Sequence, residues 1–384
     1  MNAGWVPGVS TIQALGRAGI EVHAVDSRPW ALGFRSRYAR PVLVPDHHAD
    51  EEGFVEALAA LGDRLDTPAP LFPVDDEDLA VLARNRSRLG GRFLYPFPDW
   101  ETLAPIMDKR VQLTRARELG LPAPAWGDDA DFPVLLKPLE SVRFRLRFGV
   151  KAVLCRTPAE LAAARERTRG FETFAVEWIP GGDGALWSLG AYLAPGGEAL
   201  ATFCFRKLRQ DPRLLGNGRV VVAASEPTVV EQGLALLRGL GSHGLAHVEL
   251  KRDPRDGLFK LVEVNSRLWQ FHSLATESGV NFPLVAHRHL TRARVEPPSN
   301  GKGHGRWAIT FKANRVPVVP RPPYHDPLRS SPATTPECPR ARRLHGAGGR
   351  ALRQASPARV TRSSTAASSR ARSRREIAAS SAAG

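Results

Sequence analysis

His247-Val-Glu-Leu-Lys-Arg-Asp253 and Leu261-Val-Glu-Val-Asn-Ser-Arg-Leu-Trp269 are the two stretches from which the fold of this chain can be inferred. In both, apolar and polar residues alternate, and this period of two predicts a β-strand whose alternate side chains share one face. Glu263 and Asn265 are two positions apart, so their side chains are predicted to point the same way.

The run from Arg252 to Gly257 is rich in turn-forming residues and predicts that the two strands form one hairpin. A turn centred near Asp256 sets Glu249 opposite Glu263. Two carboxylates that face each other across a ladder repel, so a cation is expected between them. Carboxylate and amide oxygens suit Mg²⁺, usually together with substrate phosphates and water, and Mn²⁺ fits almost as well. The alternation alone is also typical of a hairpin with one solvated polar face.

Length and composition indicate a globular protein of two or three domains, because 384 residues with 42% hydrophobic content are enough for proper cores. No run of about 18 apolar residues occurs, and the N-terminus lacks a basic stretch followed by an apolar one. Neither a membrane span nor a signal peptide is therefore expected, and the protein is expected in the cytoplasm. Cys155, Cys204 and Cys338 are too widely spaced for a disulfide framework or a metal knuckle.

The positive charge is concentrated at the C-terminal end. From Arg315 onward there are fourteen arginines, no lysine and three acidic residues, which accounts for +11 of the formal charge of +15. The remaining +4 is ordinary for a soluble enzyme. After about Val316 the composition of Arg, Ser, Ala, Pro and Gly has no period and predicts a disordered or frame-shifted tail. A basic tail that binds RNA or membrane lipid is the alternative.

The first hundred residues alternate short strands with helical periodicity, which is the pattern of a doubly wound α/β domain. A helix that ends at Gly19 precedes a strand over 21–26. Further strands are predicted at 41–44, 71–74 and 92–95, and helices at 51–61 and 77–89.

The next two hundred residues contain a second series of elements. A helix over 108–119 ends at Gly120, and two prolines follow, which is a plain stop signal. Strands are predicted at 132–138, 149–154, 171–179, 185–193, 199–208 and 219–222, ahead of the hairpin. Helices are predicted at 158–169, 227–240, 274–279 and 282–290.

The hairpin sequence resembles the metal-binding strands of the ATP-grasp superfamily, specifically its carboxylate-amine ligase-like members. The similarity extends from near residue 2 to about residue 315. It implies an α/β fold (α+β in the ATP-grasp part), with a doubly wound pre-ATP-grasp domain followed by a two-subdomain ATP-grasp fold. The expected domains are 1–107 (pre-ATP-grasp), 108–298 (ATP-grasp), 299–315 (end of the ordered region) and 316–384 (basic tail).

The resemblance also implies roles for individual residues. The expected metal ligands are Glu249, Glu263 and Asn265. The expected catalytic residues, which contact phosphate, acyl phosphate or substrate carboxylate, are Arg267, Lys207 and Arg209. The expected ATP-binding residues are Lys109, Lys137, Glu177, Trp178, Ile179 and Asp183. The two lysines are expected to contact phosphate, Glu177–Ile179 to contact the adenine, and Asp183 to contact the ribose.

Two departures from the family pattern stand out. Family members begin with a buried strand ahead of the loop that is here Asn2–Gly8, and that strand is missing, so a misplaced start or a truncated fragment is expected. The loop after Lys137 is usually rich in Gly and Ser, whereas here it reads Ser141-Val-Arg-Phe-Arg-Leu-Arg-Phe-Gly149. Its arginines are expected to supply charge where backbone amides are lacking.

The resemblance implies an ATP-dependent ligase that joins a carboxylate to an amine through an acyl phosphate, with ATP converted to ADP and phosphate. Small-molecule acid and amine substrates are expected as partners, and neither membrane nor nucleic acid is. The sequence leaves open whether the protein forms a homodimer, and it does not identify the substrates. The alternatives are a nucleotide-binding but inactive fragment and a nucleic-acid-binding protein that uses the basic tail.

Overall fold

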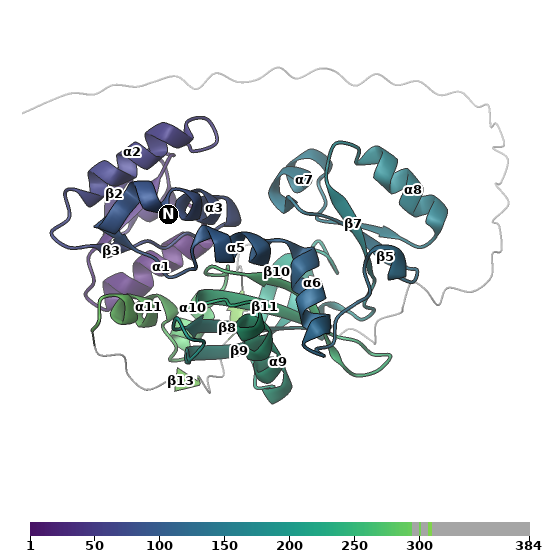
Figure 1. Ribbon diagram of the computed structural model, residues 1–384. Helices are drawn as coiled ribbons and strands as arrows, with labels where there is room; N and C mark the ends of the chain where they lie inside the picture. The colour runs from purple at the N-terminus through teal and green to yellow at the C-terminus, as the bar shows by residue number, and fades with distance from the viewer. Residues whose placement is uncertain (294–298, 301–305, 309–384) are drawn as a thin grey trace, which may run out of the picture. The chain divides into compact units, whose positions relative to one another are not determined.

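The computed structural model of the protein describes residues 1–293, 299–300 and 306–308 (Figure 1). The chain divides into two units, Met1–Arg329 and Ser330–Gly384, and every described residue belongs to the first. The predicted tail over 316–384 lies outside the described residues. So does the predicted segment 299–315, apart from the short strands β13 (Ser299–Asn300) and β14 (Arg306–Ala308).

The N-terminal part of the described chain alternates helices with short parallel strands, as predicted. Its elements are α1 (Val6–Arg17), β1 (Val22–Asp26), η1 (Leu32–Arg35), β2 (Ala39–Leu43), α2 (Glu51–Gly62), β3 (Ala69–Pro70), α3 (Asp76–Arg84), α4 (Arg86–Leu89), η2 (Gly90–Arg92), β4 (Phe93–Leu94) and α5 (Trp100–Met107). β1 pairs with β2, and β3 pairs with β4, both in parallel. The strand predicted at 71–74 is wrong by about two residues, because Pro73 has no N–H to continue the ladder.

Residues 1–3 connect the two parallel pairs through backbone hydrogen bonds. The ammonium group of Met1 donates to the carbonyl oxygen of Phe72 at 2.8 Å. The N–H of Ala3 donates to the carbonyl oxygen of Val25 at 3.2 Å. The segment ahead of α1 therefore contributes polar contacts to both pairs.

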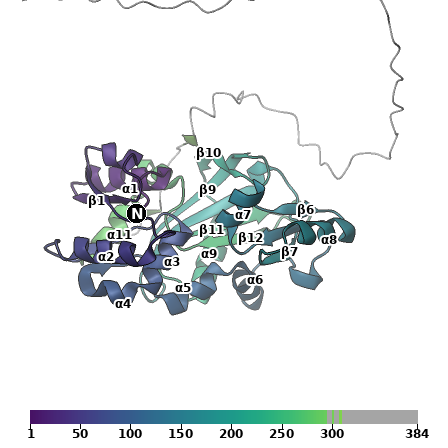
Figure 2. The same ribbon diagram turned by 90° about the horizontal axis from the view of Figure 1, so that it is seen from above.

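A small three-stranded sheet follows α6 (Lys109–Glu118) and η3 (Gly127–Asp129). Its elements are β5 (Val134–Pro138), α7 (Ser141–Phe148), β6 (Val153–Cys155), α8 (Pro158–Arg167) and β7 (Thr173–Glu177). The strand order is β6-β5-β7, with antiparallel pairing throughout. Figure 2 shows α8 beside β6 and β7.

The loop expected after Lys137 is in fact the helix α7. Its sequence contains no glycine until Gly149, which ends the helix in the left-handed conformation with φ of +74°. Phe144 is fully buried and packs edge-on against Phe171, so the helix has an apolar anchor. The prediction of an arginine-rich loop after Lys137 was therefore wrong, because the helix end at Gly149 and the aromatic packing of Phe144 favour a helix.

A second, larger sheet forms the rest of the described chain. Its elements are η4 (Asp183–Ala185), β8 (Leu186–Leu193), β9 (Ala199–Asp211), β10 (Asn217–Ala223), α9 (Pro227–Gly239), β11 (Gly244–Arg252), β12 (Phe259–Asn265), α10 (His272–Glu277) and α11 (Phe282–Leu290). The strand order is β12-β11-β8-β9-β10-β14, and β13 pairs with β9.

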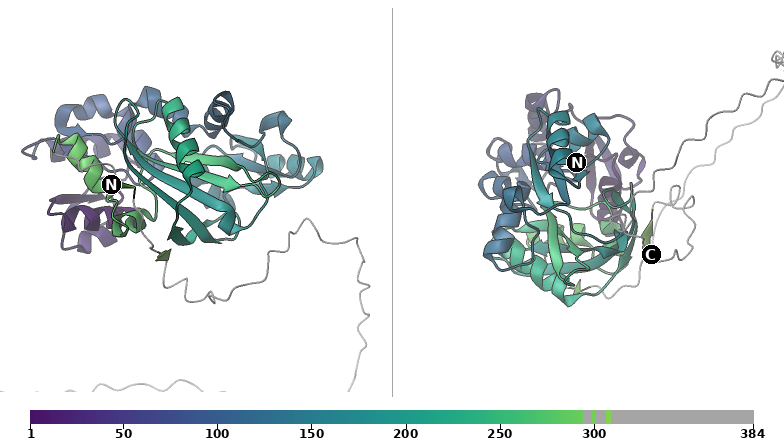
Figure 3. Two further views of the ribbon diagram at one scale, coloured as in Figure 1. Left: turned by 90° about the horizontal axis from the view of Figure 1, so that it is seen from below. Right: turned by 90° about the vertical axis from the view of Figure 1, so that its right-hand side faces the viewer.

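The two faces of this sheet carry separate apolar cores. On β9, Cys204 packs into the core that contains α9, whereas Phe203 and Phe205 pack into the core that contains α10 and α11. This alternation follows from the period of two along a strand. Figure 3 shows α9 lying along one face of the sheet.

Candidate active site

A cavity of about 680 Å³ opens between the N-terminal elements, the small sheet and the large sheet. Most of the residues predicted for the site line it: Lys109, Lys137, Glu177, Trp178, Ile179, Lys207, Glu249, Glu263, Asn265 and Arg267. Asp183 and Arg209 do not line it. The structure therefore gathers residues that are as far apart in sequence as Lys109 and Arg267 around one space.

The hairpin at one wall of the cavity has the predicted register. β11 and β12 are antiparallel, with Glu249 opposite Glu263 and His247 opposite Asn265. Glu263 and Asn265 point the same way, as predicted, and the Asn265 amide donates to a Glu263 carboxylate oxygen at 3.3 Å. The prediction that two carboxylates face each other here is confirmed.

The ammonium group of Lys207, from β9, forms an ion pair with Glu249. Both side chains are almost completely buried. A cation therefore does lie beside the facing carboxylates, and it is a lysine of the chain itself. Among the described residues, no cluster of three or more His, Cys, Asp or Glu side chains could hold a metal ion. A metal here would be held by two carboxylates and the Asn265 amide oxygen, a set that needs phosphate oxygens or water to complete it.

Three further lysines surround Glu263. Lys109 donates to the Ser141 hydroxyl at 2.9 Å, and Lys137 donates to the carbonyl oxygen of Val262 at 3.4 Å. Lys151 donates to the Asn217 side chain at 2.6 Å. Although burial by itself would raise the pKa of Glu263, these lysines lower it to about 2. The pocket is therefore strongly positive around one ionised carboxylate, which suits a polyphosphate.

Burial also changes the lysines. It lowers the pKa of Lys137 to about 8 and lowers that of Lys151 as well, in both cases against the pull of Glu263. Buried ammonium groups of this kind gain most when an anion arrives. Lys151 was missed by sequence reasoning. The one local signal for it is a lysine between the left-handed Gly149 and β6, which is not specific.

Asp108 places Lys109 at the mouth of the cavity. Its carboxylate accepts from the N–H of Arg110 at 2.8 Å and so caps the start of α6. Lys109 is the first residue of that helix, and its side chain reaches the first residue of α7. The lysine thereby connects two elements that border the cavity.

Glu177, the last residue of β7, lines the cavity together with the two residues that follow it. Glu177 is already bonded to protein: one oxygen accepts from Arg255 at 2.5 Å, and the other from the N–H of Ala125 at 3.2 Å. Lys251 donates to the Ile179 carbonyl oxygen at 2.7 Å. Its ammonium group also lies 4.2 Å from the centre of the Trp178 ring. Sequence reasoning missed Lys251, because its contacts depend on β11 packing against a segment far away in the chain.

Asp183 holds the end of β9. Its carboxylate accepts from the backbone and side-chain N–H groups of Gln210, at 3.0 and 3.1 Å, and from the N–H of Leu214 at 2.9 Å. Its expected role at the ribose stays a prediction. Arg209 and Lys207 were expected to share a face. A β-bulge between β9 and β10 lies at this point, and only Lys207 lines the cavity.

Arg267 lies just beyond β12 and contacts the N-terminal part of the chain. Its Nε and Nη2 atoms donate to the two carboxylate oxygens of Asp76 at 2.7 and 2.9 Å. Asp76 is the first residue of α3. The predicted catalytic arginine is thus held by a residue 191 positions earlier, which the sequence did not indicate.

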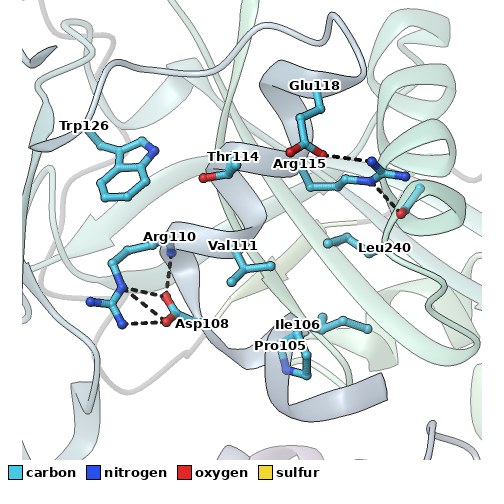
Figure 4. A pocket seen from close by; sticks show the side chains of 11 residues that line it. Pro105, Ile106, Asp108, Arg110, Val111, Thr114, Arg115, Glu118, Trp126 and Leu240 are labelled. Atoms are coloured by element: carbon cyan, nitrogen blue, oxygen red, sulfur yellow. Dashed lines mark hydrogen bonds and ion pairs between the residues drawn. The ribbon is translucent and has the colours of Figure 1, made fainter. Parts of the chain in front are cut away.

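A second cavity, of about 600 Å³, lies at α6 and is shown in Figure 4. Val111 and Trp126 are among its lining residues, and Arg115 donates to the Gly239 carbonyl oxygen at 2.8 Å. None of the predicted site residues lines it.

Within the described part of the chain, no helix has both the length and the apolar character needed to span a bilayer.

The chain is similar to a curated ligase. No family model matches the chain. A D-aspartate ligase from Enterococcus faecium (strain Aus0004) is 26% identical over 249 residues, which cover 59% of this chain and 58% of that protein. The chain thus spans less than two thirds of the length of this relative.

Solved structures share the architecture. An L-amino acid ligase from Bacillus licheniformis matches with a TM-score of 0.58 at 17% identity, over 75% of this chain and 74% of that one. The ADP complex of N5-carboxyaminoimidazole ribonucleotide synthetase matches with a TM-score of 0.62 at 14% identity, over 78% of each chain. At such identities a match shows the fold. The chain therefore shares the ATP-grasp fold of these structures, as expected from the sequence.

Proposed function

We propose that this protein is an ATP-dependent ligase that joins a small carboxylate to an amine. The observation that carries this proposal is the set of lysines, Lys207 buried and the other three half-buried, around Glu249 and Glu263 in a single cavity. Four cations next to two facing carboxylates are unusual unless the site also accepts a highly charged ligand. A triphosphate with a divalent metal ion satisfies both kinds of charge at once.

In this proposal the residues divide the work by charge. Lys109, Lys137 and Lys151 neutralise the phosphates of ATP and orient them. Glu249, Glu263 and Asn265 would hold Mg²⁺, or Mn²⁺, which would neutralise phosphate charge when bound. The segment Glu177–Ile179 is proposed to bind the adenine, and Asp183 is proposed to reach the ribose.

The reaction needs no reactant besides the carboxylate, the amine and ATP. A carboxylate oxygen attacks the γ-phosphorus of ATP, the bond to the β,γ-bridging oxygen breaks, and ADP leaves. The amine nitrogen then attacks the acyl carbon, the C–O bond to phosphate breaks, and inorganic phosphate leaves with loss of an amine proton. Lys207, Arg209 and Arg267 are proposed to contact the phosphoryl group or the substrate carboxylate during these steps.

The relatives support this proposal in kind. The curated relative is named a D-aspartate ligase and one matching structure an L-amino acid ligase, so both names describe amino acids as substrates of a ligase. We propose domain boundaries at 1–107 and 108–298 for the two functional parts. The acid and the amine are proposed to be small molecules, and screening is needed to identify them.

The test is the thermal midpoint of the full chain with and without ATP and Mg²⁺. Ligand that binds the folded state must raise stability by mass action, by about 2.7 kcal/mol at a hundred times Kd. The rise should require both ATP and metal, and it should be lost in Lys137→Ala and Glu263→Ala. Glu52→Ala, in an exposed ion pair with Arg88, is the matched control. No rise in a folded, cooperative sample would disprove the proposal.

Ligase chemistry then needs its own measurement. Hydroxylamine can replace the amine, because it traps an acyl phosphate as a hydroxamate without knowledge of the natural nucleophile. A panel of amino acids and other small acids, beginning with D-aspartate, is screened for hydroxamate and for ADP. ATP binding without hydroxamate from any acid would favour a nucleotide-binding protein without ligase activity.

A further inference from the structure

The Arg267 guanidinium presents two hydrogen-bonding edges, and the protein uses them unequally. The Nε–Nη2 edge makes a bidentate pair with Asp76 at 2.7 and 2.9 Å. The Nη1–Nη2 edge makes only long contacts of 3.3 Å, to the Leu268 carbonyl oxygen and to the Asn265 amide oxygen. One edge is thus firmly bound, while the other is weakly held beside the expected metal ligands.

This arrangement places residues that are far apart in the sequence in one continuous row of contacts. Glu263, Asn265 and Arg267 follow one another at intervals of two, and each contacts the next. Asp76, at the start of α3, ends the row. Arg267 is mostly buried, with 19% of its side chain exposed, and both it and Asp76 line the cavity.

We propose that Asp76 is a positioning residue for Arg267. By holding the Nε–Nη2 edge, it turns the Nη1–Nη2 edge toward the γ-phosphoryl group of ATP. An arginine loses rotamer freedom when it is fixed, and here Asp76 has already fixed it before the ligand arrives. The domain that precedes the ATP-grasp fold thereby completes the phosphate site. This proposal rests on the function proposed above.

The pair is suited to this task because a bidentate Arg–carboxylate contact fixes the plane of the guanidinium as well as its place. A single hydrogen bond would leave the plane free to rotate. The partly buried setting also reduces screening by solvent, so the contact is worth more than an exposed ion pair.

The ratio of ATP affinity to ADP affinity tests the proposal. Only ATP carries the γ-phosphoryl group, so the ratio reports on its contacts, and it does not change when a variant merely unfolds in part, since both nucleotides bind the same folded fraction. Calorimetric titration of the full chain with MgATP and with MgADP should show a fall of about tenfold in this ratio for Asp76→Ala and for Arg267→Ala. Asp76→Glu should restore part of it.

The chain offers a matched control in Glu277→Gln. Glu277 accepts from Arg17 at 2.9 Å. The two residues therefore also form an acid–arginine pair, in this case between α10 and the N-terminal helix α1. Their side chains are exposed and do not line the cavity. The ratio should stay at the wild-type value in this variant.

Each remaining outcome is decisive. An unchanged ratio in Asp76→Ala, or in Arg267→Ala, overturns the positioning role while nucleotide binding, and with it the proposed function, stands. A rise in ATP affinity in Asp76→Ala overturns it too, because Asp76 would then compete with phosphate for the arginine. If Asp76→Ala does not fold, Asp76→Asn takes its place, since it keeps the shape and one acceptor but loses the charge. A wild-type chain that binds neither nucleotide refutes the proposed function and the positioning role together.

Discussion

Lys207 and Glu249 form a buried ion pair that reaches across β8, the strand that separates β9 from β11 in the large sheet. Ser188 on β8 lies opposite both Glu249 and Phe205, and its small side chain is fully buried. The lysine thus neutralises one of two facing carboxylates. In the proposed ligase, a metal ion held by Glu249 would compete with this ammonium group.

Replacing Lys207 by Met should destabilise the free protein by about 3–5 kcal/mol, because it leaves a buried carboxylate without its partner. The same change should increase the rise in thermal midpoint on adding Mg²⁺, since the metal no longer competes with the ammonium group. Differential scanning fluorimetry with a Mg²⁺ series measures both effects. Arg17→Met, in an exposed pair, should cost at most about 1 kcal/mol. A weaker response to Mg²⁺ in Lys207→Met would show that the lysine supports metal binding.

Lys137→Met should stabilise the free protein while it weakens ATP binding. Burial lowers the pKa of Lys137 to about 8 from an ordinary value of 10.5, so the folded state is penalised for the charge. The gain should be complete below about pH 8, on the order of 1–3 kcal/mol, and should vanish as the pH rises to about 10.5, where the unfolded lysine is neutral too. Urea unfolding at pH 7 and pH 10 measures it. Lys137→Arg keeps the charge and should show no gain at either pH.

Acid should destabilise the protein partly through His272. Burial lowers its pKa to about 4, and its Nε2 lies 3.1 Å from the Pro7 carbonyl oxygen and 3.3 Å from the Thr11 hydroxyl. The unfolded state therefore binds a proton between about pH 6.5 and pH 4 that the folded state does not, and stability falls as the pH falls through this window. One such group contributes about 1.4 kcal/mol per pH unit.

His272→Gln should flatten this dependence by about one proton, as measured by urea midpoints at pH 7, 6 and 5. His48→Gln, at an exposed side chain, should leave the slope unchanged. Equal slopes in the wild type and in His272→Gln would contradict the prediction. His247, whose pKa burial likewise lowers to about 4, should account for part of the slope that remains.

Gly190 should be intolerant of any side chain. A Cβ there would lie 2.1 Å from the Trp269 ring, which is itself buried and stacked on His247. Gly190→Ala should therefore cost about 1–3 kcal/mol through overpacking, and it should disturb the cavity wall that Trp269 forms. Urea unfolding and MgATP titration measure the two effects. Gly91→Ala, where a Cβ meets nothing within 4 Å, is the control.

Several elements of the site could be predicted because their causes are local. The alternation of apolar and polar residues, together with a turn-forming run, predicted the register that sets Glu249 opposite Glu263. An apolar stretch ending in Lys137 predicted β5, and a glycine followed by prolines predicted the end of α6. In each case neighbouring residues determine the backbone, so a window of sequence contains the answer.

Other features had no local cause. Lys151 contacts a residue 66 positions away, Lys251 one 72 positions away, and Arg267 one 191 positions away. Period and propensity determine which side chains share a face of a strand or helix, but not which faces meet. The sequence by itself therefore determined the hairpin, most of the elements and most of the candidate site residues. Tertiary packing alone decided that Lys207 neutralises Glu249 and that Asp76 holds Arg267, because burial and long-range charge pairing act only once the elements have come together. Packing of Phe144 against Phe171 also contributed to making the segment after Lys137 the helix α7.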